Sequence, residues 1–135
     1  MVALIPGAHN NFYVYQDPAE INQIGQSSSY SYGTQPSVVR VYYLYPSALG
    51  NILFDGNHWF PEEYTDLNVE SLNKNYALTK DVFYYTYPFV SDDYKVGKYF
   101  YGERITVLYT SVNNPNWGYT GLGWIQLGNN VSEVL

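Results

Sequence analysis

The chain of 135 residues suits one ordinary domain or two very small ones, and it contains 17 tyrosines although only 13% of its residues are charged. Six Lys and Arg stand against 12 Asp and Glu, and the net charge of -6 argues against binding to the phosphates of nucleic acid or to anionic lipids. The absence of cysteine excludes disulfides and thiolate zinc sites.

Short runs of β-branched and aromatic residues predict strands almost throughout the chain. In chain order these runs are FYVYQ (12–16), SVVRVYYLY (37–45), DVFYYTY (81–87), KYFYG (98–102) and ERITVLYTSV (103–112). In the last run, Ile105, Val107 and Tyr109 occupy every second position, which is the period of a strand with one buried face. The chain is therefore predicted to be all-β.

One segment, PEEYTDLNVESLNKN (61–75), differs from the predicted strands. It begins with Pro61 and two acids, as a helix can, but Leu67 and Leu72 fall on opposite phases of a helix. We expect a linker at 67–75, with one short helical turn at most in the segment. This linker separates a first unit, 1–66, from a second unit, 76–135.

Neither a signal peptide nor a membrane span is expected. The first ten residues, MVALIPGAHN, have no basic region and only a short apolar run. No stretch approaches the roughly 18–20 apolar residues that span a bilayer. Any secretion signal or anchor is expected outside this sequence.

The two predicted units share a succession of features, which indicates an internal repeat. Four pairs of segments align in the same order: NNFYVYQDP (10–18) with KDVFYYTYP (80–88), QIGQ (23–26) with KVGK (95–98), YSYGTQPSVVRV (30–41) with YFYGERITVL (99–108), and NHWF (57–60) with LGWI (122–125). We therefore expect a duplication in which each half forms its own barrel, with Phe12 and Phe83 at equivalent positions.

The second unit has the pattern of a known class of modules. The pair Val96-Gly97, the strand YGERITVL entered after a glycine, and the closing Gly123-Trp124-Ile125 resemble bacterial SH3-like domains of the SH3b and GW type. The first unit departs from this pattern, with HWF in place of the last triplet and a long insertion at 45–57. The resemblance implies two small SH3-like β-barrels in tandem.

The same resemblance implies a function at the cell wall. Such paired modules occur in surface and S-layer-associated proteins and in endolysins of Gram-positive bacteria, so we expect a secreted, non-catalytic module attached to the cell wall. Because the chain is acidic whereas many teichoic-acid-binding modules are basic, the expected ligand is a neutral wall polysaccharide or peptidoglycan. Two alternatives stay open: a surface-layer protein that self-assembles, and an accessory domain of a wall hydrolase.

Catalysis is not expected from the ionisable residues. The acid pairs at 62–63 and 92–93 lie in turn-like segments, where adjacent acids usually face solvent rather than flank a cleft. His9 and His58 are the only histidines, which is too few for a metal site or an activated nucleophile. We expect no enzyme activity, no cofactor and no metal.

The aromatic residues are the candidate ligand site. The resemblance implies that Trp124 packs at the barrel edge with Ile125 inside, whereas Trp117 lies among turn formers, where burial is difficult. Trp117 is therefore predicted to form an exposed platform for wall ligand, with the alternative that it only caps the barrel, and tyrosine likewise serves to complete thin cores. The predicted ligand-binding residues are Trp117, Tyr119 and Tyr84 in the second unit and His58 and Trp59 in the first.

Overall fold

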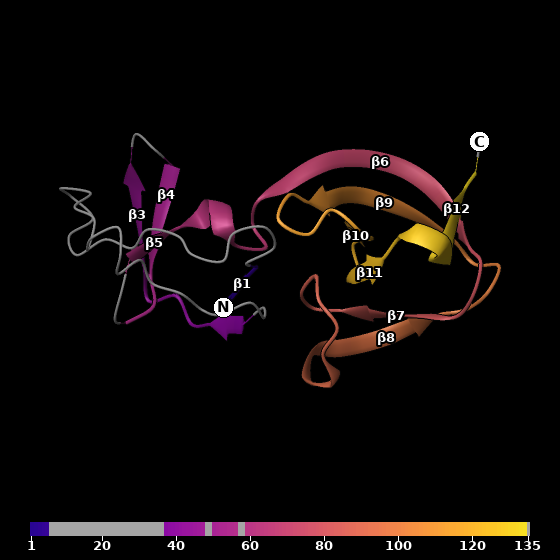
Figure 1. Ribbon diagram of the computed structural model, residues 1–135, viewed down its shortest axis with the longest axis horizontal. Helices are drawn as coiled ribbons and strands as arrows, with labels where there is room; N and C mark the ends of the chain where they lie inside the picture. Colours follow the sequence, from indigo (N-terminus) through magenta and orange to yellow (C-terminus); the bar gives the residue numbers. More distant parts are fainter. Residues whose placement is uncertain (6–36, 48–49, 57–58, 135) are drawn as a thin grey trace. The chain divides into compact units, whose positions relative to one another are not determined.

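The computed structural model describes residues 1–5, 37–47, 50–56 and 59–134 (Figure 1). Over these residues the chain is all-β, as predicted, with twelve strands and three short 3₁₀ turns. It divides into two compact units, Met1–Asn68 (unit 1) and Val69–Leu135 (unit 2). Each unit is described by itself.

The described residues of unit 1 form a two-stranded and a three-stranded antiparallel sheet. β1 (Val2–Leu4) pairs with β2 (Ser37–Val39), and the second sheet has the order β3 (Tyr43–Ser47), β4 (Gly50–Phe54), β5 (Trp59–Pro61). On its other side β1 meets the end of the unit, through the bridge between Leu4 and Thr65. β1 therefore lies between β2 and the segment that closes the unit.

The core of unit 1 forms where alternate residues of β4 and β5 meet β1. Leu53 and Phe60 are direct partners across β4 and β5, and they pack with Val2 and Leu4 in one buried cluster. Their sequence neighbours in the two strands point to the other face, because side chains alternate along a strand. The expected helical turn is present as the 3₁₀ turn η1 (Glu62–Tyr64), directly after β5.

Several predicted features of the first unit lie outside the described residues. They are the strand at 12–16 with Phe12, the segment at 23–26, and most of the segment at 30–41. The predicted equivalence of Phe12 and Phe83 therefore stays a prediction. The predicted strand at 37–45 is present as β2 and β3, with a break between them.

Unit 2 consists of one antiparallel seven-stranded sheet with the order β12-β6-β9-β10-β11-β7-β8. β6 and β9 are its two long strands and curve side by side in Figure 1. Its elements are β6 (Val69–Leu78), β7 (Val82–Tyr85), the 3₁₀ turn η2 (Asp92–Tyr94), β8 (Lys95–Tyr99), β9 (Arg104–Ser111), β10 (Trp117–Tyr119), β11 (Trp124–Gln126), η3 (Gly128–Asn130) and β12 (Val131–Glu133).

The described strands form open sheets, whereas the sequence predicted closed barrels. In unit 2 the edges are β12 and β8, and among the described strands no ladder joins them. The edge strand β8 is lined by two cations: Nζ of Lys95 lies 4.0 Å and Nζ of Lys98 5.4 Å from the ring centre of Phe83. Lysine on an edge strand disfavours pairing with a further strand.

The linker expected at 67–75 is largely a strand instead. The boundary between the units follows Asn68, and residues 69–75 belong to β6. A β-bulge between Ser71 and Lys74 interrupts the register with β9, and Asn73 in the bulge has a left-handed backbone with φ of 53°. Because a bulge shifts the alternation of side chains, the strand pattern is not visible in the sequence.

Unit 2 contains two clusters of buried side chains. The Ile125 cluster consists of Leu78, Tyr99, Ile105, Val107 and Ile125. The Trp117 cluster consists of Tyr85, Trp117 and Trp124, with Tyr109 and Tyr119 packed against it. The neighbours Trp124 and Ile125 belong to different clusters because successive side chains of a strand point to opposite faces.

Candidate functional site

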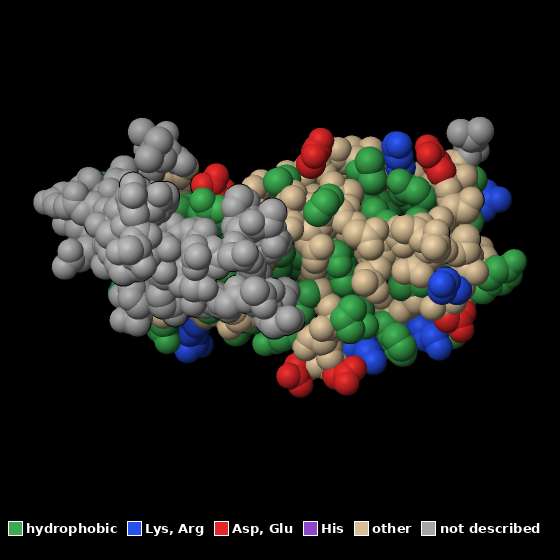
Figure 2. Space-filling view, in the orientation of Figure 1, with side chains coloured by type: hydrophobic (Ala, Val, Ile, Leu, Met, Phe, Trp, Pro, Cys, Tyr) green, Lys and Arg blue, Asp and Glu red, His purple; other side chains and the backbone are tan. Residues whose placement is uncertain are grey.

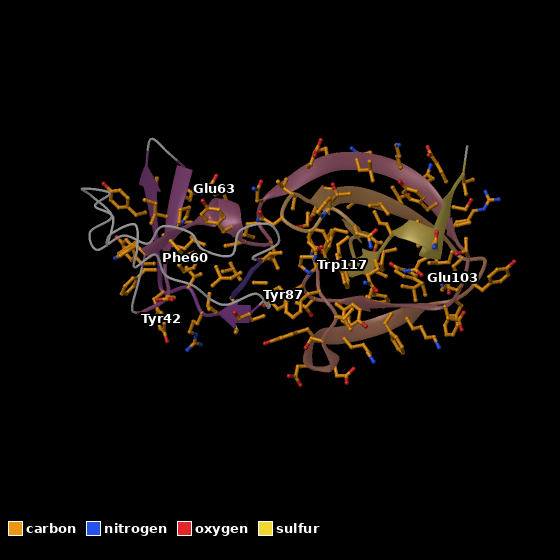
Figure 3. The ribbon with its side chains drawn as sticks, in the orientation of Figure 1. Tyr42, Phe60, Glu63, Tyr87, Glu103 and Trp117 are labelled. Carbon is orange, nitrogen blue, oxygen red and sulfur yellow. The ribbon has the colours of Figure 1, made fainter. Side chains whose placement is uncertain are left out.

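The expected exposure of Trp117 is wrong. Trp117 begins β10 and is only 4% exposed, and its ring meets the ring of Tyr85 edge-on with 5.7 Å between centroids. Figure 3 shows Trp117 inside unit 2, among the side chains of several strands. Trp117 is therefore a core residue of this unit and not the centre of an exposed platform.

The turn residues around Trp117 explain its burial. The N–H of Trp117 donates to the carbonyl of Asn114 at 3.0 Å, and the Asn114 side chain donates to the carbonyl of Pro88 at 2.8 Å. The carbonyl of Asn116 accepts the N–H of Leu127 at 2.7 Å. The turn is therefore tight and anchored at both ends, so it delivers Trp117 directly into a strand instead of holding it on a loop.

The other predicted site residues do not gather around Trp117. Tyr119 shares its cluster, but Tyr84 packs against the Ile125 cluster, with its ring 4.8 Å from that of Tyr99. Tyr84 also lies over Gly97 and Gly123, where a Cβ atom would meet its ring. His58 lies outside the described residues. The predicted platform of Trp117, Tyr84 and Tyr119 therefore does not form.

Trp59 belongs to a different arrangement, a row of three rings across the sheet of unit 1. Tyr43, Phe54 and Trp59 are direct partners on β3, β4 and β5. Phe54 stacks on Trp59 at 4.7 Å, and Tyr43 meets Trp59 edge-on at 6.0 Å. Tyr43 is 61% exposed and the other two rings are partly exposed. We call these three residues row 1.

Unit 2 has a row of the same construction. Tyr109, Tyr119 and Trp124 are direct partners on β9, β10 and β11. Tyr109 stacks on Tyr119 at 5.0 Å with 9° between the ring planes, and Tyr119 lies 5.4 Å from Trp124. The two tyrosines are half-buried and Trp124 is buried. We call these three residues row 2.

Sequence reasoning found Trp59, Tyr119 and Trp124 but not their cross-strand partners. Tyr43 and Tyr109 are far from the tryptophans in sequence, whereas Phe54 lies on the strand just before Trp59, and strand pairing brings all three into the rows. One signal was present: the alignment of NHWF (57–60) with LGWI (122–125) equates Trp59 with Trp124. Following the strand partners outward from that alignment would have located both rows.

The acid pairs at 62–63 and 92–93 that the sequence singled out make local contacts in the structure. Glu62 accepts a hydrogen bond from the Asn51 amide at 3.3 Å, and Asp92 pairs with Lys95 at 3.2 Å on the surface. Within the described ranges no three side chains of the His, Cys, Asp or Glu type are grouped to hold a metal ion. Figure 2 shows the charged side chains of unit 2 scattered over the visible face, without a patch of either sign.

Burial perturbs two of the ionisable groups that the structure describes, Asp66 and Tyr99. Burial raises the pKa of Asp66 above its ordinary value of 3.8, although the Ala3 N–H donates to its Oδ1 at 2.9 Å and opposes the rise. Burial likewise raises the pKa of Tyr99, whose hydroxyl contacts that of Thr120 at 2.7 Å. Both groups tie strands together and neither lies in a row, so we assign them structural roles.

A shallow groove lies outside both rows, on unit 2. Its volume is about 290 Å³, and β6, β9 and the residue after β12 line it. The lining residues are Asn75, Tyr76, Arg104, Ile105, Thr106 and Val134. The Thr106 hydroxyl donates to the Asn75 side chain at 2.7 Å, so part of the polar lining is satisfied internally.

No family model, no curated protein and no solved structure matches the chain. The SH3-like resemblance therefore rests on the residues quoted from the sequence. In the part of the chain that the structure describes, there is no helix with the length and apolar character needed to cross a membrane.

Proposed function

We propose that this chain is a non-catalytic module of two SH3-like units that attaches to the bacterial cell wall by binding peptidoglycan or a wall polysaccharide. The observation that carries the proposal is row 1, in which three aromatic rings are aligned across three strands and Tyr43 is largely exposed. In this proposal the protein acts outside the cell, on the wall of a Gram-positive bacterium.

Aligned rings suit a sugar polymer for physical reasons. The C–H face of a sugar ring is apolar and stacks on an aromatic face, while tyrosine also offers a hydroxyl to the polar edge of the ligand. A row held by strands keeps its spacing without loss of side-chain entropy on binding, because the rings already pack on each other. Row 1 therefore presents a preformed surface of the kind that a glycan needs.

The charge of the chain supports a neutral ligand. With a net charge of -6, the protein repels polyanions such as teichoic acid at long range. Stacking on uncharged sugars depends little on ionic strength, whereas charge pairing at the surface weakens over a Debye length of about 8 Å at physiological salt. Binding to purified wall is thus expected to survive added salt.

The test is retention on insoluble peptidoglycan stripped of teichoic acid. Tyr43→Ala is expected to reduce retention about tenfold, because it removes the most exposed ring of row 1. Tyr42→Ala is the matched control, since Tyr42 directly precedes Tyr43 in the chain, is 62% exposed, and lies outside the row. Equal retention of the two variants and the unmodified chain would refute the role of row 1.

Self-assembly is the second candidate, and it too has a structural observation in its favour. Exposed apolar side chains lie on β7, on β8 and in the turn that follows β8, namely Phe83, Val96, Phe100 and Tyr101. Concentration-dependent sedimentation without wall material separates this candidate from wall binding. Release of soluble fragments from purified wall would instead favour a part in a wall hydrolase.

A further inference from the structure

Rows 1 and 2 occupy the same position in their units. In each unit the first ring lies on the strand before a hairpin, the second on its return strand, and a tryptophan opens the next strand. We propose that row 2 is a second site of the same kind as row 1, so that one chain holds a repeating neutral glycan at two places. This inference rests on the function proposed above for row 1.

The last two rings of each row are joined by connections of the same length, with glycine at the same position. Four residues connect Phe54 to Trp59, and four connect Tyr119 to Trp124. The second residue of each connection is a glycine with a left-handed backbone, with φ of 97° at Gly56 and 95° at Gly121. Residues other than glycine rarely adopt this conformation, so the two connections share a specific backbone conformation at their second residue and not only a composition.

The flanking positions agree as well. The residues that follow the tryptophans, Phe60 and Ile125, are both fully buried in the core cluster of their own unit. In β5 and β11 the tryptophan therefore points away from that core cluster. The shared register supports the same role for both rows.

Row 2 offers less exposed ring surface than row 1. Trp124 is 4% exposed and packs against both tyrosines of the row. Tyr109 and Tyr119 are half-buried and stacked nearly parallel. The Tyr119 hydroxyl donates to the carbonyl of Gly121 at 3.2 Å, which fixes the ring against its own hairpin. Row 2 therefore takes a sugar against the exposed parts of two tyrosines and is the weaker of the two sites.

Two sites on one chain change how a polymer is held. When one site is bound, the second meets the same polymer at an effective concentration set by the connection, and the combined affinity exceeds either single affinity by about 10²–10⁴-fold. A short fragment that reaches only one site gains nothing from this effect. The ligand class is accordingly a long, repeating, uncharged polymer, and short pieces of it bind weakly.

The experiment is an NMR titration of the whole chain with a soluble oligosaccharide of four N-acetylglucosamine units. Shift changes at the backbone amides of both rows, with saturation at two oligosaccharides per chain, are the expected result. Shift changes at row 1 alone would overturn the second site and leave the proposed function intact. Shift changes at neither row, together with unchanged retention of Tyr43→Ala on wall, would overturn both.

Variants separate the rows further. Tyr109→Leu keeps apolar volume but removes the first ring of row 2, and Tyr101→Leu, at a 74% exposed tyrosine of unit 2 outside the row, is its control. Tyr109→Leu is expected to abolish the shifts at row 2 only, and to lower retention on insoluble wall by about tenfold or more. Retention equal to that of the control would contradict two-site binding. If Tyr109→Leu unfolds, the titration of the unmodified chain still decides the number of sites.

Discussion

Trp59 and Trp124 take the same place in similar sheets, yet they differ in burial. Each opens a three-residue strand, pairs with an aromatic residue on the preceding strand and precedes a fully buried residue. Trp124 has a further partner, because β7 pairs with β11 and brings Tyr85 beside it. Trp59 stays partly exposed. An equivalent position thus contributes to the core in unit 2 and to the surface in unit 1.

The same comparison explains Trp117. Trp117 pairs with Gln126 in unit 2 as Ile52 pairs with Pro61 in unit 1, two residues along the strands from each row, and both Trp117 and Ile52 are buried. The position is a core position in both units, and unit 2 fills it with a larger side chain. The neighbouring turn formers were therefore a misleading guide to exposure.

The largest expected effect comes from removing the two equivalent tryptophans. Trp124→Ala is expected to lower the free energy of unfolding by about 3–5 kcal/mol, because it empties a buried site against Tyr85, Tyr109 and Tyr119. Trp59→Ala is expected to cost about 1–2 kcal/mol, because its ring is partly exposed already. Urea unfolding of both variants measures the difference. Equal losses would remove the distinction between a core row and a surface row.

A smaller effect is expected at Gly123, which precedes Trp124. A Cβ atom there would lie 2.8 Å from Cδ2 of Tyr84 and 2.9 Å from the backbone oxygen of Tyr85. Gly123→Ala is therefore expected to destabilise unit 2 by about 1–3 kcal/mol. Tyr84→Leu in the same chain relieves the first contact but not the second, so it should restore part of the loss. Full stability of Gly123→Ala would mean that this hairpin is not constrained as described.

The smallest effect concerns pH and unit 1. Because the pKa of Asp66 is raised in the folded state, its contribution to stability is fully present below 3.8 and is lost as pH rises through the folded-state pKa. Asp66→Asn keeps an oxygen for the Ala3 N–H but carries no charge, so it should be at least as stable at neutral pH. The positive Met1 amino group nearby opposes the shift.

Urea unfolding of Asp66→Asn and of the unmodified chain between about pH 3 and pH 7 checks this. The stability of the variant relative to the unmodified chain should rise with pH across the titration of Asp66. A relative stability that falls with pH would show that the folded protein prefers the ionised carboxylate.

The sequence predicted those features that depend on local pattern. The all-β class follows from runs such as that at 103–112, which contains β9, and the alignment equated Trp59 with Trp124, which open β5 and β11. β6 was missed because its bulge at Asn73 shifts the alternation and most of its side chains are polar and exposed. The sequence did not predict the complete rows, because the register between strands decides which rings become partners, and no single segment determines that register.

The pairing of first and last segments has a consequence for folding during synthesis. In unit 1, β1 bonds to the residues around Thr65, and in unit 2, β6 pairs with β12. Each unit can complete its hydrogen bonding only after its final residues have left the ribosome, and such non-local pairing slows folding. Unit 1 can finish while unit 2 is still being made, so the nascent chain exposes the unpaired strands of one unit at a time.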